Sequence, residues 1–301
     1  MMEYFLRLCT MGDPPTLSID SQRFIQLKTS KSILREALAL EEEYEIVISN
    51  YIDLEKESIN VSISHMVRGY GSYVDSFDIR IALNRRLMNL LTSVRLYADQ
   101  LASHCSACLP NEIGIKEEVK SFFSNEYDKN FNYRFMEALR NHLQHYGTAV
   151  HQVMYGSRWT SIDIDGLLEF SSNFSAEKEF LVANSHFKKQ ILNEMPEKVD
   201  LISASRGYIE ALSSIHNKSR QTISKKVDEA RAIMQAAKDD YRAVYKKEFV
   251  GLSAYEFDGA VKTDEIPILL NWDDIRIELV KRNSYLVNLN KRYVTAQVKK
   301  K

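Results

Sequence analysis

Two long seams of apolar residues, each with the spacing of a coiled coil, constrain this chain most strongly. The first alternates steps of four and three residues, at Ile33, Ala37, Leu40, Tyr44, Val47, Tyr51, Leu54, Ser58 and Val61. The second repeats every seven residues, at Ile209, His216, Ile223, Ala230, Ala237 and Val244, with Val227, Met234 and Tyr241 on the partner positions. Each seam predicts a long helix that needs a partner helix. The first helix and a second copy of the chain are both candidates to pair with the second seam.

Apolar residues at helical spacing predict helices over residues 30–68, 76–104, 115–127, 131–147 and 197–249. Gly147 is expected to end the fourth in a left-handed conformation. A last helix begins at Trp272, with Asp273 as its cap. The 301 residues include 10 glycines and 5 prolines, and this scarcity favours long helices. Alternating residues and Asp-Gly pairs predict small β elements over 151–172 and 251–270. The fold class is therefore mostly α.

The pattern divides the chain into three consecutive regions. Residues 1–29 alternate weakly before prolines and a glycine, which predicts an N-terminal arm, either an edge strand or a loosely docked segment. Residues 30–150 are expected to form a helical bundle. Residues 151–301 are expected to form a helical C-terminal region with one very long helix and one or two small β elements. The acidic run at 41–43 is expected to be a solvated face.

Composition limits the partners. The chain has 40 basic and 41 acidic residues, so any contact with nucleic acid has to come from a local patch. Its three cysteines are too few for a disulfide framework and suit a reducing compartment. The N-terminus lacks the basic start and apolar core of a signal peptide, and no apolar run is long enough to span a membrane. We expect a soluble, cytoplasmic protein without membrane contact.

The segment Phe131–Gly147, FNYRFMEALRNHLQHYG, concentrates chemistry on one predicted helix. Arg140, His142 and His145 lie within a turn and a half of each other. Asn141 and His145 are four residues apart and share one face. Arg140 lies roughly 140° from His145 on the ideal helix. Arginine and histidine would therefore converge best across two copies of the helix in a two-fold dimer.

That combination has the groups that a metal-free ribonuclease needs. One imidazole can take the proton of the RNA 2′-hydroxyl while another protonates the leaving 5′-oxygen. An arginine supplies a fixed cation for the charge that develops on the phosphate. Pairs of arginine and histidine at this spacing also arise by chance, so the helical context carries the hypothesis.

The sequence Arg140-Asn141-x-x-x-His145, near the end of a helix in a four-helix arrangement, resembles the HEPN superfamily (higher eukaryotes and prokaryotes nucleotide-binding domain). The resemblance covers about residues 30–150. It implies a HEPN-like bundle and a metal-independent endoribonuclease that acts as a homodimer and leaves a 2′,3′-cyclic phosphate. It implies Arg140 and His145 as catalytic residues, with Asn141 in support. It also implies a role in bacterial toxin or phage-defence systems, with an antitoxin or another defence protein as partner. One toxin subgroup has a tyrosine two residues after the histidine, where this chain has Gly147.

Further residues are candidates to contact the RNA substrate: His142, Tyr146, Arg134 and Arg158. An arginine-rich helix with Arg80, Arg85, Arg86 and Arg95 either lines the path of the RNA or forms a solvated face.

The sequence does not offer enough candidate ligands in one place for a metal site. His142 and His145 are three residues apart, but no second pair of ligands stands out. His104 stands beside the pair Cys105 and Cys108, and no further zinc ligands follow at short spacing. We expect two buried or loop cysteines, no metal and no cofactor.

A different class of function stays open. The two heptad seams could build a coiled-coil-like scaffold or interaction protein, HEPN-like or not, in which the polar cluster at 140–145 is incidental or binds a nucleotide.

Overall fold

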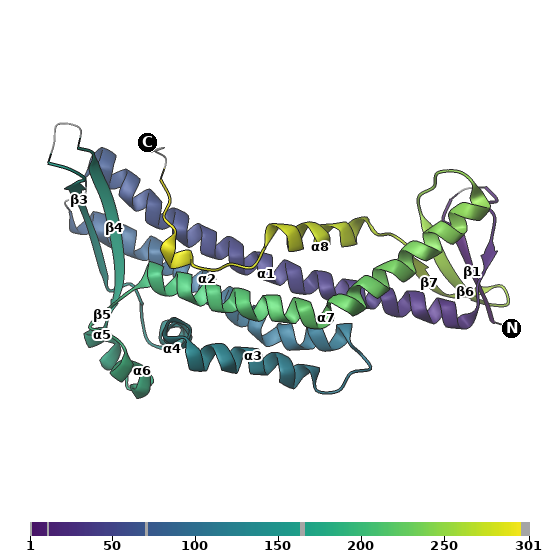
Figure 1. The fold of residues 1–301 in the computed structure, drawn as a ribbon, viewed down its shortest axis with the longest axis horizontal. Helices are drawn as coiled ribbons and strands as arrows, with labels where there is room; N and C mark the ends of the chain where they lie inside the picture. The colour runs from purple at the N-terminus through teal and green to yellow at the C-terminus, as the bar shows by residue number, and fades with distance from the viewer. Residues whose placement is uncertain (1, 11, 70–71, 163–165, 296–301) are drawn as a thin grey trace. The chain divides into compact units, whose positions relative to one another are not determined.

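The computed structural model describes residues 2–10, 12–69, 72–162 and 166–295, and helices dominate it (Figure 1). The mostly α class is confirmed. None of the helices within these ranges is long and apolar enough to cross a membrane. The three longest helices are α1 (Ser21–Arg68), α2 (Tyr73–Cys108) and α7 (Leu201–Tyr245). The others are α3 (Ile115–Lys129), α4 (Phe131–His145), α5 (Lys178–Val182), α6 (Lys189–Glu194), α8 (Asn271–Arg282) and a 3-10 turn, η1 (Leu289–Lys291).

The strands form two small antiparallel sheets, and both expected β elements are present. One sheet has the order β2-β1-β6-β7, with β1 (Met2–Leu8), β2 (Leu17–Ser18), β6 (Leu252–Asp258) and β7 (Val261–Pro267). The other has the order β3-β4-β5, with β3 (Gln152–Trp159), β4 (Leu168–Glu177) and β5 (Lys198–Asp200). Gly259 has a φ of 59° in the turn between β6 and β7, the left-handed conformation that an Asp-Gly turn requires.

The N-terminal segment is not an edge strand or a loose arm, so that expectation is wrong. Strand β1 lies inside its sheet, paired with β6 from Met2↔Asp258 to Leu8↔Leu252. Helix α1 also begins at Ser21, well before Ser30. The sequence could not reveal the pairing because the partner strand lies about 250 residues further along the chain.

The chain divides into two compact units, each built from separate segments. Unit 1 comprises Met1–Glu43, Gln100–Lys120 and Asn217–Ser284. Unit 2 comprises Tyr44–Asp99, Ser121–His216 and Tyr285–Lys301. The consecutive division into 1–29, 30–150 and 151–301 therefore does not match the compact units, because α1, α2 and α7 each contribute residues to both.

Unit 1 has an apolar core from its helical segments and buries part of the acidic run. The core includes Ile33, Leu40, Ile223 and Met234, which the two seams predict. Glu41 is 3% exposed and accepts a hydrogen bond from Nε of Arg220 at 2.7 Å. The expectation of a solvated acidic face is wrong for Glu41, because the ion pair with the partly covered Arg220 offsets the desolvation of its carboxylate.

Unit 2 continues both seams and contains α4. The seam residues Tyr44, Val47, Tyr51 and Leu54 are buried here. The ring of His216 stacks on Tyr44 with centroids 3.7 Å apart. Nδ1 of His216 lies 2.9 Å from the hydroxyl of Tyr97. His216 therefore packs in the core, as its seam position predicts.

Two predicted helix ends differ from the structure. Helix α2 continues to Cys108, so Cys105 and Cys108 lie on a helix and not in a loop. The cap of α8 is Leu270, whereas Asp273 is fully buried and paired with Arg231 and Arg276. Both differences follow from tertiary burial. Helix ends predicted from neighbouring residues in the sequence do not take that burial into account.

Candidate functional site

Helix α4 in unit 2 holds most of the residues for which chemistry was predicted. Asn130 caps its start by accepting a hydrogen bond from the backbone N–H of Tyr133 at 3.3 Å. At its end, the N–H groups of Tyr146 and Gly147 donate to the carbonyl of His142 at 2.8 and 3.1 Å. Gly147 does not adopt the expected left-handed conformation, because these bonds close the helix without it. The buried face consists of Tyr133, Phe135, Met136, Ala138, Leu139 and His142.

Arg140 is largely covered, with 11% of its side chain exposed. Its Nη1 lies 3.5 Å from Oε2 of Glu137, one helical turn earlier. Its Nη2 donates to Oδ1 of Asn141 at 2.9 Å. Glu137 also accepts a hydrogen bond from the buried hydroxyl of Tyr208, and burial raises the pKa of that hydroxyl well above its usual value. The guanidinium is therefore fixed in place by its own helix.

Asn141 and His145 are both exposed and lie four residues apart on the same face of α4. No hydrogen bond or ion pair of the His145 side chain is found within the described ranges. Asn141 accepts a hydrogen bond from Nη2 of Arg140, which links the arginine to a residue on the face of His145. We call the side chains at 140, 141 and 145 the α4 cluster. Asn141 and His145 are accessible, whereas Arg140 is largely covered and is joined to the cluster through Asn141.

His142 is buried, with 3% exposure, and does not belong to the α4 cluster. Its Nε2 lies 3.2 Å from the carbonyl of Thr148, which can only accept, so Nε2 carries the proton. Its Nδ1 therefore accepts from the amide of Asn184 at 3.0 Å. Burial lowers the pKa of His142. The substrate contact expected of His142 does not fit this neutral imidazole, which is bonded on both sides.

Arg134 is also engaged within the protein. Its Nη1 donates to the carbonyls of Tyr127 and Asp128 at 2.6 and 2.9 Å, and its Nη2 contacts Glu194. An arginine that binds the last carbonyls of α3 acts as a C-terminal cap. With 13% of its side chain exposed, Arg134 holds α3, α4 and α6 together and does not fit the RNA contact expected of it.

The other two expected RNA contacts are accessible. Arg158 lies on β3 with 80% of its side chain exposed, and its Nε donates to Glu169 of β4 at 2.7 Å. Tyr146 is 56% exposed, and its hydroxyl donates to the carbonyl of Ala183 at 3.0 Å. Both are thus partly used by unit 2 itself. Within the described residues, neither side chain forms a hydrogen bond or ion pair with the α4 cluster, so the structure does not gather all seven predicted residues in one place.

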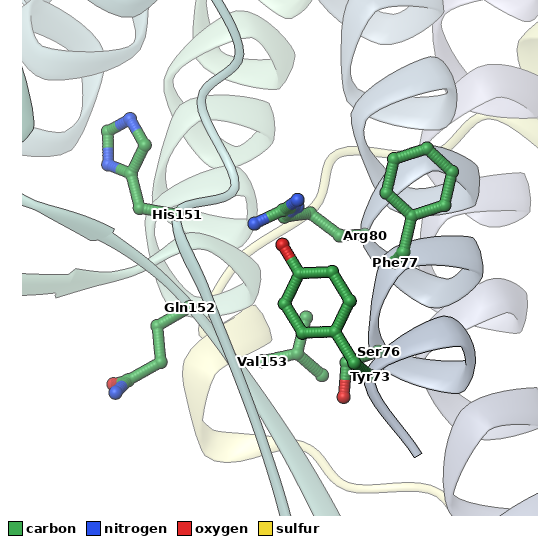
Figure 2. A pocket seen from close by; sticks show the side chains of 7 residues that line it. All are labelled: Tyr73, Ser76, Phe77, Arg80, His151, Gln152 and Val153. Carbon is green, nitrogen blue, oxygen red and sulfur yellow. The ribbon is translucent and has the colours of Figure 1, made fainter.

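A cavity of about 200 Å³ lies in unit 2 between the start of α2 and the start of β3 (Figure 2). Helix α2 contributes Tyr73, Ser76, Phe77 and Arg80, and the β3 side contributes His151, Gln152 and Val153. We call it the Arg80 pocket. None of the seven predicted site residues lines it, whereas Arg80 belongs to the arginine-rich helix for which an RNA path was one of the two alternatives. The helical spacing of its α2 residues is visible in the sequence, but the approach of β3 depends on the tertiary fold.

His151, in the wall of the Arg80 pocket, is neutral. Its Nε2 donates to the carbonyl of Thr148 at 3.0 Å, and its Nδ1 accepts from the backbone N–H of Glu177 at 2.9 Å. Burial lowers its pKa, and the positive charge of Arg80 acts in the same direction. The same Thr148 carbonyl accepts from His142, whose ring centroid lies 6.2 Å from that of His151.

The histidine beside the cysteine pair has a structural environment in unit 1. Nδ1 of His104 lies 2.8 Å from Glu36, and its Nε2 lies 3.2 Å from Glu43. These carboxylates, Glu43 first, raise the pKa of His104. Burial raises the pKa of the Cys105 and Cys108 thiols to about 12, which suits packed and unreactive thiols.

Within the part of the chain that the structure describes, no group of three or more His, Cys, Asp or Glu side chains could hold a metal ion. Comparison with models of known protein families and with curated protein sequences finds no match for this chain.

Proposed function

We propose that this protein is a metal-independent endoribonuclease of HEPN type whose reacting groups lie in the α4 cluster. One observation supports this most: His145 is exposed and has no partner among the described residues, and it shares a helix face with the asparagine that is hydrogen-bonded to Arg140. An exposed imidazole can both accept and donate a proton, as general acid–base catalysis requires.

The proposed reaction is an internal transfer on RNA. An imidazole removes the proton of the 2′-hydroxyl, the 2′-oxygen attacks phosphorus, and the bond from phosphorus to the 5′-oxygen breaks. A second imidazole gives its proton to the leaving 5′-oxygen, which leaves a 2′,3′-cyclic phosphate. Arg140 stabilises the charge on the phosphate oxygens, and Asn141 orients either the phosphate or the arginine.

The reaction needs two imidazoles, whereas each α4 cluster presents one. His142 is buried and bonded on both sides, so it is not the second. We therefore propose a homodimer in which His145 of each copy acts on the same phosphate. A cytoplasmic role in toxin or phage defence, with an antitoxin or another defence protein as partner, completes the proposal.

A cleavage assay tests the proposal. Labelled single-stranded and structured RNA are incubated in EDTA with wild type, His145→Ala and Gln144→Ala. Loss of a general acid or base costs about 10²–10⁴-fold in rate, so we expect that loss for His145→Ala. Gln144 is the exposed neighbour of His145 and serves as the matched control, which should cleave normally. Equal cleavage by wild type and His145→Ala would rule out the mechanism, and loss of wild-type activity in EDTA would rule out metal independence.

A second function, an interaction protein, is favoured by an exposed apolar surface in unit 2. At the ends of α1 and α2, Val67 is 70% exposed, Tyr73 81% and Val74 65%. On the hairpin of β3 and β4, Trp159 is 65% exposed and Ile162 fully so. Large exposed apolar side chains of this kind mark binding surfaces where they form a contiguous patch. A wild-type protein that cleaves no RNA, but elutes as an oligomer that Val67→Ser and Val74→Ser dissociate, would support this function instead.

A further inference from the structure

The Arg80 pocket contains a positive charge that no described residue neutralises. Across the described ranges, the Arg80 side chain makes no hydrogen bond or ion pair, although it is half-buried. The other inward arginine of this part of α2, Arg86, is paired with Asp53 and Glu57. The imidazole of His151 in the pocket wall is neutral and already bonded on both sides. A half-buried cation without a counter-ion favours the approach of an anion, because charge-assisted hydrogen bonds are the strong ones.

The helix geometry keeps acidic groups out of the pocket. Tyr73, Ser76, Phe77 and Arg80 are spaced i, i+3, i+4 and i+7, so they share one face of α2. The nearby acidic residues, at 75 and 78, lie about 150° round the helix from the centre of that face. Figure 2 shows the side chain of Arg80 extending from α2 towards the side of the pocket where His151 lies. An incoming anion would therefore meet the guanidinium without a competing carboxylate from α2.

The chemistry of the lining identifies the class of ligand. A guanidinium binds phosphate oxygens with two parallel hydrogen bonds. The hydroxyl of Ser76 adds a further donor. Tyr73 and Phe77 are exposed by 81% and 46% and offer aromatic faces beside the charge, as in sites that bind single-stranded nucleic acid. Pockets that enclose drug-sized ligands measure about 300–1,000 Å³, so a cavity of about 200 Å³ suits one phosphate with its base at the rim.

We propose that the Arg80 pocket binds one backbone phosphate of single-stranded RNA, with the attached base stacked on Tyr73 or Phe77. The pocket is linked to α4 by the imidazoles of His151 and His142, whose centroids are 6.2 Å apart, and His145 is one turn beyond His142. The bound phosphate would flank the one that is cleaved. The identity of the ligand as RNA rests on the proposed function, whereas the anion site rests on Arg80 itself.

Direct binding tests the inference without catalysis. Fluorescence anisotropy of a labelled single-stranded RNA is measured in the His145→Ala background, with Arg80→Gln or Arg85→Gln added. Arg85 is exposed on the same helix, outside the pocket, and is the matched control. We expect Arg80→Gln to weaken binding about tenfold or more, and to reduce the slope of log K against log salt by about 0.7, as for one phosphate contact. Arg85→Gln should change affinity less than twofold.

Two further variants separate charge from stacking. Arg80→Lys keeps the positive charge but loses the two parallel hydrogen bonds of a guanidinium, so its affinity for RNA should lie between those of wild type and Arg80→Gln. Tyr73→Ser combined with Phe77→Ser should weaken binding without changing the salt slope, because stacking releases no counter-ions. Equal effects of Arg80→Gln and Arg85→Gln, or no effect of either, would overturn the inference.

Competition distinguishes an RNA strand from a free nucleotide. Unlabelled UMP and inorganic phosphate at micromolar concentration should not displace the RNA, and displacement by UMP would overturn the assignment to a strand. The outcome is separable from that of the proposed function. If RNA binding depends on Arg80 but wild type cleaves no RNA, the inference about the pocket stands and the proposed nuclease function fails. If wild type cleaves RNA but Arg80→Gln binds RNA normally, the nuclease function stands and the inference about the pocket fails.

Discussion

His142 and His145 lie one turn apart on α4 and have opposite environments. His142 joins the end of α4 to the Thr148 turn and to Asn184, and both ring nitrogens are used. His145 is exposed and has no internal partner in the described parts of the chain. The histidine that packs and the histidine proposed to react are thus three residues apart, and their side chains point about 60° apart around the helix axis.

This contrast predicts that two alanine substitutions change stability by very different amounts. His142→Ala leaves a buried amide and carbonyl without their partner, which costs about 1–3 kcal/mol. His145→Ala should change the free energy of unfolding by less than about 0.5 kcal/mol, as at other exposed positions. Urea unfolding followed by circular dichroism measures both. A His145→Ala protein that is destabilised as much as His142→Ala would mean that His145 is structural.

At the scale of elements, His104 ties α2 to α1 in unit 1. Glu36 and Glu43 are seven residues apart on α1, so they share one face and approach His104 from both ends of the imidazole. The raised pKa means that the folded protein holds a proton on His104 at pH values where the unfolded chain has lost it. The pair of ion contacts is therefore complete below the unfolded pKa of about 6.5 and is lost as pH rises through the folded pKa.

The contribution of His104 to stability should consequently fall as pH rises above about 6.5. His104→Gln should remove this fall, so that the difference in unfolding free energy between wild type and variant narrows with increasing pH. His186→Gln replaces an exposed histidine and should leave the pH dependence of wild type unchanged. Urea unfolding at a series of pH values from 5.5 to 8.5 provides the measurement. If the difference in unfolding free energy between wild type and His104→Gln does not change with pH, the ion contacts of His104 with Glu36 and Glu43 are contradicted.

At the scale of the whole molecule, both compact units consist of segments that are far apart in sequence. In unit 1, Cys108 contacts the carbonyl of Ile33 on α1 at 3.6 Å. Cys105 shares a hydrogen bond with Ser219 on α7, and burial raises the pKa of its thiol to about 12. The two thiols are thus covered only when parts of α1, α2 and α7 come together.

Thiol reactivity should report this assembly. In the folded protein at pH 8, a thiol reagent such as DTNB should react quickly with the exposed Cys9 and slowly with the other two cysteines. All three should react quickly in denaturant. Cys9→Ser serves as the control and should abolish the fast phase. Rapid reaction of two or three thiols in the folded protein would contradict the packing of unit 1.

Local sequence determined the helices, since an apolar stripe with a step of three or four residues is a property of neighbouring positions. The seam residues from Ile33 to Leu54 and from Ile209 to Ala237 are buried as predicted. The two β elements and the Asp258-Gly259 turn were visible for the same reason. The polar end of α4 could also be located, and Asn141 and His145 are accessible there.

The tertiary structure alone decided which elements pair and which polar residues they bury. It made β1 an inner strand, divided three helices between two units, and gave partners to Glu41, Arg134 and His142. It also brought β3 to the face of α2 that bears Arg80. Periodicity fixes which face of an element is apolar. It does not specify the distant segment that covers that face, and the burial and hydrogen bonding of each polar side chain depend on that segment.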